Sequence, residues 1–162
     1  MSGFDVRFET NADKVASDIK QFGHRFDPNG PNVKAFMLSR GQWQRKTILD
    51  RCARGQDVDG NTFAAYSSRY IEILKKVPHP LNVDLARSGD MLASVQPYWI
   101  GGGVIHIDVG GGGFSRTELN KAKFHHRIPR GKPRKFMGIS SSDQKAHLDD
   151  FRLWRAEQAK GW

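Results

Sequence analysis

The sequence has one cysteine, Cys52, and its longest apolar run is only a few residues. A single cysteine excludes an internal disulfide and a zinc site built from several cysteines of one chain. Because Cys52 stands at helical spacing among apolar residues, we expect a buried thiol that packs rather than reacts. The start, MSGFDVRFE, lacks the charged-then-apolar pattern of a signal peptide, so we expect neither membrane insertion nor secretion, and a chain made in the cytosol.

The sequence also has few groupings typical of catalytic or metal sites. His106 and Asp108 fall on one face of a predicted strand, but no serine or cysteine nucleophile stands beside them, which favours an exposed polar face over a catalytic dyad. His125 and His126 are adjacent, and no third ligand follows at metal-site spacing. We therefore expect no enzyme activity, no metal, no cofactor and no small-molecule substrate.

The stretch around Asp57, Asp59, Gly60 and Asn61 invites comparison with a calcium-binding loop. An EF-hand needs a bidentate glutamate at the twelfth position of its loop, and Ser68 stands there. We predict a structural turn, in which Asp and Asn side chains accept hydrogen bonds from nearby backbone and glycine supplies a positive φ.

Acidic residues are missing from one segment, residues 121–135, which contains seven Lys and Arg and no carboxylate. Pro129, Gly131 and Pro133 predict a semi-extended loop there, and with the glycines of 110–113 they indicate one glycine-rich and basic extended loop over residues 110–135. Such a segment can bind a polyanion or an acidic partner, or can simply be solvated. The candidate partner-facing or DNA-facing residues are Lys121, Lys123, Arg127, Arg130, Lys132, Arg134 and Lys135.

Length and periodicity predict a single α+β domain spanning residues 1–162 with one moderate core. Alternation or 3–4 spacing of apolar residues and turn-forming residues mark the expected elements. These are a strand at 4–8, a helix at 11–23, a longer helix at 33–54, a helix or extended arm at 67–76, a helix from Asn82 through Leu92, two strands at 93–99 and 104–109 joined by glycines, and a final helix at 141–160 capped by Ser141 or Ser142. The expected architecture is a small antiparallel sheet packed with several α-helices.

The helix at 33–54 has two apolar faces. Phe36 and Trp43 lie nearly opposite a stripe that comprises Leu38, Ile48, Leu49 and Cys52. Two apolar faces need two partners, so one face packs on the core and the other on a second layer of the same chain or on a neighbouring subunit. The helix also carries six Lys and Arg against one acid, so it is a second basic element that could face DNA.

Four blocks stand in a recognisable order. They are Gly55-Gln-Asp-Val-Asp-Gly60, LARSGDMLASV at 85–95, a glycine-flanked strand, and IPRGKPRKFMGISSSD at 128–143. The order resembles the phage virion morphogenesis family, the tail-completion proteins of tailed phages, over roughly residues 35–155. The last block matches through Pro133, Arg134, Phe136, Met137 and Gly138.

The resemblance implies a structural virion protein of the tail or neck, assembled in the host bacterial cytoplasm. It implies a homo-oligomeric ring, for example a hexamer, that contacts other neck and tail proteins and packaged DNA and enables head–tail joining. We take Phe36, Trp43, Phe136 and Met137 as candidates for the oligomer interface. The alternative is a non-enzymatic DNA-binding protein that acts through the Lys121–Lys135 loop, with salt-dependent affinity and little sequence preference.

Overall fold

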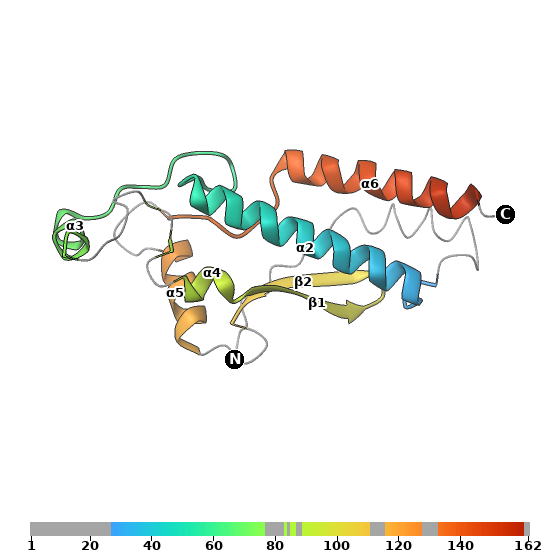
Figure 1. Cartoon of the computed structure of the whole chain (residues 1–162), viewed down its shortest axis with the longest axis horizontal. Helices are drawn as coiled ribbons and strands as arrows, with labels where there is room; N and C mark the ends of the chain where they lie inside the picture. Colours follow the sequence, from blue (N-terminus) through green and yellow to red (C-terminus); the bar gives the residue numbers. More distant parts are fainter. Residues whose placement is uncertain are drawn as a thin grey trace.

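The computed structural model describes residues 27–76, 83, 85–86, 89–110, 116–127 and 133–160. The predicted strand at 4–8 and helix at 11–23 lie outside these residues. A two-stranded antiparallel sheet and several helices form an α+β domain, which confirms the predicted fold class. A β-hairpin, the long helix α2 (Pro31–Ala53) and the C-terminal helix α6 (Ser141–Lys160) lie in three successive layers (Figure 1).

The hairpin consists of β1 (Val95–Gly101) and β2 (Val104–Val109), and its register pairs Val95 with Val109. Gly101, Gly102 and Gly103 all have positive φ, which is the conformation that a tight connection between two twisted strands requires. Alternate residues of β2 are buried, so one face of the hairpin is apolar. The predicted hairpin is confirmed.

Helix α2 lies on the apolar face of the hairpin. The two elements approach closely at Gly41, where an added Cβ would lie 2.7 Å from Cβ of Pro97. Ile48 and Cys52, one turn apart on the same face, are fully buried in the core. Full burial of a side chain such as that of Ile48 contributes about 1.5–3 kcal/mol of hydrophobic stabilisation. The buried thiol of Cys52 agrees with its predicted packing role.

Helix α6 covers the opposite side of α2. The ring of Phe36 stacks on Trp154 with a centroid distance of 4.7 Å and also contacts Phe151 at 6.0 Å. Trp43 meets the ring of His147 edge-on at 5.0 Å. The second apolar face of α2 therefore packs on α6 of the same chain. Both side chains remain partly exposed, so a contribution of Phe36 and Trp43 to an oligomer interface stays a prediction.

Two segments differ from the sequence prediction. Helix α4 (Asp90–Ala93) is a single turn, and Leu85 has a φ of 61°, so the helix expected from Asn82 does not include residue 85. Residues Arg116–Arg127 form helix α5, which packs against α4 and β2, so the extended loop predicted for 110–135 is wrong over this range. The segment 116–127 contains no proline or glycine, so nothing in it breaks a helix. The helix-breaking Pro129, Gly131 and Pro133 come only after its last residue.

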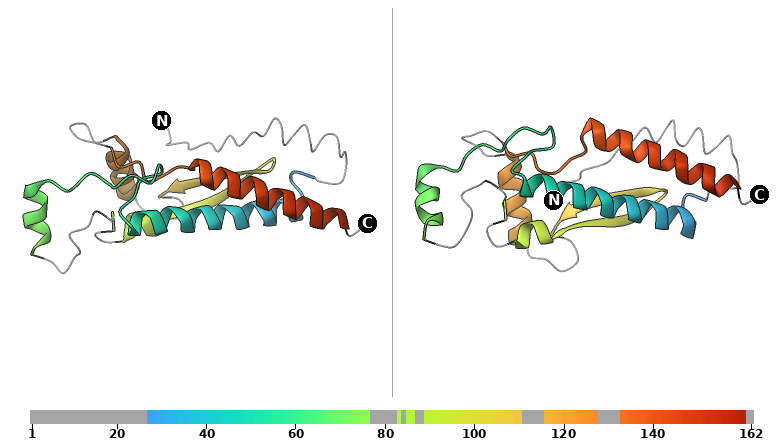
Figure 2. Two further views of the ribbon diagram at one scale, coloured as in Figure 1. Left: turned by 90° about the horizontal axis from the view of Figure 1, so that it is seen from above. Right: turned by 45° about the horizontal axis from the view of Figure 1, so that its top comes forward.

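The short helix α3 (Ser68–Leu74) stands apart from the three layers (Figure 2). Ser67 caps it, because the backbone N–H of Tyr70 donates to Ser67 Oγ at 3.3 Å. We call residues 64–76 the arm. No helix within the described part of the chain has the length and apolar content to cross a membrane.

Candidate functional site

Residues 133–140, which we call the strap, connect toward α6 and contain the five residues through which the last sequence block matches the family resemblance. Arg134 in the strap is only 7% exposed. Its Nε and Nη2 donate to the carbonyl of Ala64 at 3.0 and 2.8 Å, and Nη2 also donates to the carbonyl of Ala65 at 3.0 Å. The guanidinium lies over the ring of Tyr66, 5.2 Å from its centroid. Arg134 therefore anchors the root of the arm, and its predicted role as a partner-facing residue is wrong.

The strap also contacts the turn formed by residues 55–61. The backbone N–H of Val58 donates to the carbonyl of Lys135 at 2.9 Å. Gly138 has a φ of 145°, and an added Cβ there would lie 3.0 Å from Val58 Cγ2. Only glycine fits this approach without displacement of its neighbour. Two blocks of the resemblance, far apart in the sequence, are thus packed directly on each other.

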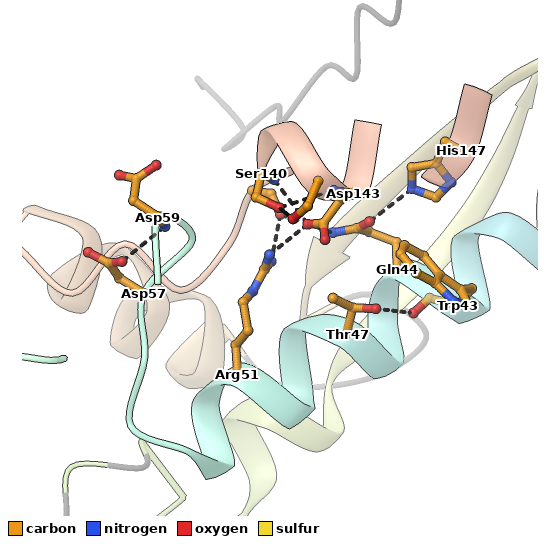
Figure 3. A network of polar contacts seen from close by, with 11 residues as sticks. Trp43, Gln44, Thr47, Arg51, Asp57, Asp59, Ser140, Asp143 and His147 are labelled. Carbon is orange, nitrogen blue, oxygen red and sulfur yellow. Dashed lines mark hydrogen bonds and ion pairs between the residues drawn. The ribbon is translucent and has the colours of Figure 1, made fainter. Parts of the chain in front are cut away.

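The turn itself is held by Asp57, whose Oδ1 accepts hydrogen bonds from the N–H groups of Asp59 and Asn61 at 2.9 and 2.8 Å. Gly60 has a φ of 82°. Asp57 and Asp59 point away from the polar cluster on α2 (Figure 3). The predicted structural turn is confirmed, and among the described residues no group of three or more His, Cys, Asp and Glu could hold a metal ion.

Two strap residues belong to the hydrophobic core. Phe136 is fully buried and Met137 is 5% exposed. His126 on α5 accepts a hydrogen bond at Nε2 from the N–H of Met137 at 3.1 Å, and its ring lies 5.0 Å from that of Phe136. The prediction that Phe136 and Met137 form an oligomer interface is wrong, because both side chains fill the interior of the chain that carries them.

A buried polar network joins α2 to the strap and to the start of α6 (Figure 3). Arg51 donates through Nη1 to Asp143 Oδ2 at 2.6 Å and through Nη2 to the carbonyl of Gly138 at 2.9 Å. Gln44 Nε2 contacts the same two acceptors, each at 3.1 Å. The side chains of Arg51 and Asp143 are both 7% exposed, so the pair is out of reach of a substrate and serves to fix α6 on α2.

Asp143 also completes the N-terminal cap of α6. Its N–H donates to Ser140 Oγ at 3.1 Å, while its Oδ2 accepts from the N–H of Ser140 at 3.0 Å. This reciprocal pair is a capping box, and the cap is Ser140 instead of the predicted Ser141 or Ser142. Burial raises the pKa of Asp143, but hydrogen bonds from Ser140, Gln44 and Arg51 outweigh it and hold the pKa below its usual value.

His147 continues the network along α6. Arg40 Nε donates to His147 Nδ1 at 3.3 Å, and His147 Nε2 lies 2.9 Å from Gln44 Oε1. An arginine cannot accept, so Nδ1 is the acceptor and Nε2 carries the proton that is donated to Gln44. Burial, and then the charge of Arg40, lower the pKa of His147, although Asp143 and Asp150 act in the opposite direction. Arg40 also forms an ion pair with Asp150.

The six basic residues of the predicted second basic element, five of them on α2, differ in their exposure. Arg40 and Arg51 are engaged with α6, and Arg45 Nε donates to the carbonyl of Val95 on β1 at 2.7 Å. Lys46 lies 4.0 Å from Asp50 across one turn. Arg54 Nε also donates to Gln56 Oε1 at 3.0 Å, so at least five of the six basic side chains contact groups of their own chain. Arg40, Arg45 and Arg51 are partly or fully buried, and the prediction of a second basic surface is wrong for these three, whereas Lys34, Lys46 and Arg54 are exposed.

The predicted basic segment is divided by the fold. Lys121 is exposed on α5 and pairs with Glu118 at 2.8 Å, Lys123 is partly exposed, and Lys135 is exposed on the strap. Phe124, which follows Lys123 on α5, is 56% exposed. The side chain of Arg127 and residues Arg130 and Lys132 lie outside the described part of the chain.

The histidines singled out in the sequence lie on α5 and in the hairpin. Burial first, and then neighbouring cationic groups, lower the pKa values of His125 and His126 to about 4. His106 lies opposite Tyr98 in the hairpin, while Asp108 Oδ1 accepts from the N–H of Val109 at 2.7 Å.

A scan against protein-family models finds no match, and searches of curated proteins and of solved structures likewise find none.

Proposed function

We propose that this chain is a structural virion protein, a tail-completion or neck subunit that forms a ring at the head–tail junction and enables head and tail to join. In this proposal it is not an enzyme, and it acts through surface complementarity in the virion after assembly in the host bacterial cytoplasm. Its partners are further copies of itself, other neck and tail proteins, and DNA in the ring lumen.

One observation carries the proposal. The blocks that resemble the phage virion morphogenesis family are separate in the sequence, yet the turn at 55–60 and the strap meet through the Val58–Lys135 hydrogen bond and the Gly138 contact. Met91 and Leu92 from the LARSGDMLASV block share the core with Phe136. A set of short motifs that builds one packed junction is more informative than the same motifs scattered over a surface, because their residue types are then required together.

Two of the four interface candidates, Phe136 and Met137, are buried, so the ring contacts require other exposed side chains. Large apolar side chains that are exposed in the single chain include Ile73 on the arm at 42% and Leu153 on α6 at 64%. Rings form when one surface repeatedly meets a different surface of the next subunit. We propose that the arm supplies one of these two surfaces, since it stands apart from the body (Figure 1).

The proposal is tested in a phage that carries the gene. A nonsense mutation should leave complete heads and complete tails that do not join, as seen by electron microscopy, and a plasmid copy of the wild-type gene should restore infectivity. A plasmid copy with Ile73→Asp should fail to restore it, although the purified variant keeps the wild-type circular dichroism spectrum. Glu72→Gln is the matched control, because it changes an exposed residue of the same helix and leaves the apolar side chain of Ile73 in place. Normal virions in the nonsense mutant would refute the proposal.

The exposed Lys121, Phe124 and Lys135 favour the alternative, a DNA-binding protein that acts outside a virion. Light scattering at low and high salt, with and without a short DNA duplex, separates the two functions. A discrete oligomer without salt-sensitive DNA binding supports the ring subunit. A monomer or dimer whose duplex binding falls steeply with salt supports the alternative.

A further inference from the structure

Helix α5 has one side that faces solvent along the helix. Glu118 and Ala122 are buried, in a helix that packs against α4 and β2. Because successive residues of an α-helix are about 100° apart, the exposed residues fall within one arc of about 140° on the other side. We call these residues the α5 face: Arg116, Thr117, Asn120, Lys121 and Phe124.

An aromatic ring stands at the centre of the α5 face. Phe124 lies near the middle of the arc, between Asn120 and Thr117 in helical projection, and is 56% exposed. The ring of His125 meets it edge-on at a centroid distance of 5.8 Å, and Phe124 still remains more than half exposed. Exposed aromatic residues of this kind are enriched at the centres of protein interfaces, where they anchor the partner.

The aromatic ring has basic surroundings. Within 116–127 the sequence has one acid, Glu118, which is 6% exposed and pairs with Lys121 at 2.8 Å. No residue of the α5 face is acidic. Burial and then the charge of Lys135 lower the pKa of His126 on α5, so this exposed lysine of the strap adds positive charge beside the helix. An acidic partner is therefore complementary to the face in charge.

A protein partner fits the α5 face better than a nucleic acid does. Non-specific binding of duplex DNA uses contacts to phosphates, which would engage the cations but leave Phe124 exposed. A single strand stacks its bases on successive aromatic rings, whereas Phe136, the phenylalanine of the neighbouring strap, is fully buried. An acidic segment with an apolar side chain satisfies both features, since its carboxylates meet the cations and its apolar group covers the ring.

We propose that the α5 face binds an acidic amphipathic segment of another protein, with an apolar side chain packed on Phe124 and carboxylates near the cations of the face and Lys135. The inference rests on the proposed function, in which the segment belongs to another neck or tail protein, and it adds the chemistry of that partner. The α5 face and the arm are on separate elements (Figure 1), so one subunit can contact the next subunit and a different protein at the same time.

Titration of the isotope-labelled full chain with acidic peptides, followed by NMR, tests the proposal. The probe is the peptide EELEELLEEL, which places its leucines on one face of an acidic helix. Its control, EEQEEQQEEQ, has the same charge and no apolar side chain. We expect the leucine peptide to shift amide signals within 116–124 and to bind at least about tenfold more tightly than the glutamine peptide. This comparison uses the wild-type chain and does not depend on the folding of a variant.

Phe124→Ser should weaken binding of the leucine peptide at least about tenfold, because it removes the anchor. Leu153→Ser is the matched control, since it removes an exposed leucine of α6 and should bind the peptide as the wild type does. Circular dichroism checks that both variants fold.

The proposal is overturned if the leucine peptide does not bind at about 1 mM, if both peptides bind equally, or if Leu153→Ser loses as much affinity as Phe124→Ser. It is also overturned, in favour of a nucleic acid, if a short DNA strand or duplex binds this face more tightly than the leucine peptide and Phe124→Ser abolishes that binding. The titration measures binding alone, so its failure is distinct from a failure of the proposed function, which head–tail joining in the nonsense mutant decides.

Discussion

Removal of either partner of the buried Arg51–Asp143 pair should destabilise the protein strongly. Both side chains are 7% exposed, and Asp143 Oδ2 accepts from Arg51, Gln44 and the N–H of Ser140. Truncation of one partner leaves the other as an uncompensated buried charge, which costs about 3–5 kcal/mol. We expect this loss of unfolding free energy for Arg51→Met and for Asp143→Ala, and about 1 kcal/mol more for the latter because the capping box is lost as well.

The double variant should be less destabilised than the sum of the two single variants, by about 0.5–3 kcal/mol, since the second substitution removes a charge that the first has already left unpaired. Urea unfolding followed by circular dichroism gives all four free energies, provided that the m-values agree. If Asp143→Ala does not fold, Asp143→Asn keeps an acceptor for Ser140 and allows a milder cycle.

Asp149→Ala is the matched control. Asp149 lies on the same helix and pairs with Arg152 at 3.0 Å, but the two side chains are 49% and 69% exposed. An exposed pair of this kind contributes about 0–1 kcal/mol. Two results would contradict the role of the network in attaching α6 to α2. One is a loss of unfolding free energy in Arg51→Met or Asp143→Ala as small as that of the control. The other is a double variant whose loss equals the sum of the two single losses.

Three further predictions follow from other contacts. Gly41→Ala should lower the unfolding free energy by about 1–3 kcal/mol in urea titrations, because the new Cβ meets Pro97, whereas alanine in an open helix would stabilise; a neutral or stabilised variant would contradict the close approach. Arg134→Lys should increase hydrogen exchange of residues 64–76 more than that of β2, because a lysine cannot reproduce the forked bonds; equal exchange in both segments would contradict the anchoring role. Burial lowers the pKa of His125 and His126 from 6.5 to about 4, so the unfolded chain binds more protons, and their stabilising contribution is complete above pH 6.5 and is lost as the pH falls toward 4; a urea midpoint that stays constant from pH 7 to 4.5 would contradict this.

The elements with strong local signals were predictable from the sequence. The hairpin follows from alternating apolar residues around three glycines, and the final helix follows from its periodicity and its serine-rich start. Helix α5 is not predicted, because the prolines and glycine at 129–133 and the glycines at 110–113 indicate a loop on either side of a segment that itself contains neither residue. Local breakers act at their own position and just before it, so Pro129 constrains little upstream of residue 128.

The polar network could not be predicted in the same way. Arg51 and Asp143 are 92 residues apart, and Gln44 and His147 are 103 apart, so no local spacing relates them. The one local signal was the Ser-x-x-Asp pattern of residues 140–143, which predicts a capping box and so an N3 carboxylate directed back toward the chain. Net charge is misleading for a related reason. It counts every arginine as available to a partner, but Arg51 and Arg134 are bound to distant groups of their own chain.

Arg134 attaches the arm through backbone carbonyls, so substitution is constrained differently at Arg134 and at the residues that it binds. The root of the arm is held at the carbonyls of Ala64 and Ala65, which every residue type provides, so the root tolerates changes of side chain but not of backbone path. Arg134 itself is not replaceable, since only a guanidinium spans both carbonyls. Beyond Tyr66, the arm supplies no residue to the core cluster shared by α2 and the hairpin, although Leu74 within it is fully buried. Related chains could therefore acquire different binding partners through changes at exposed arm positions such as Ile73, on an otherwise constant body.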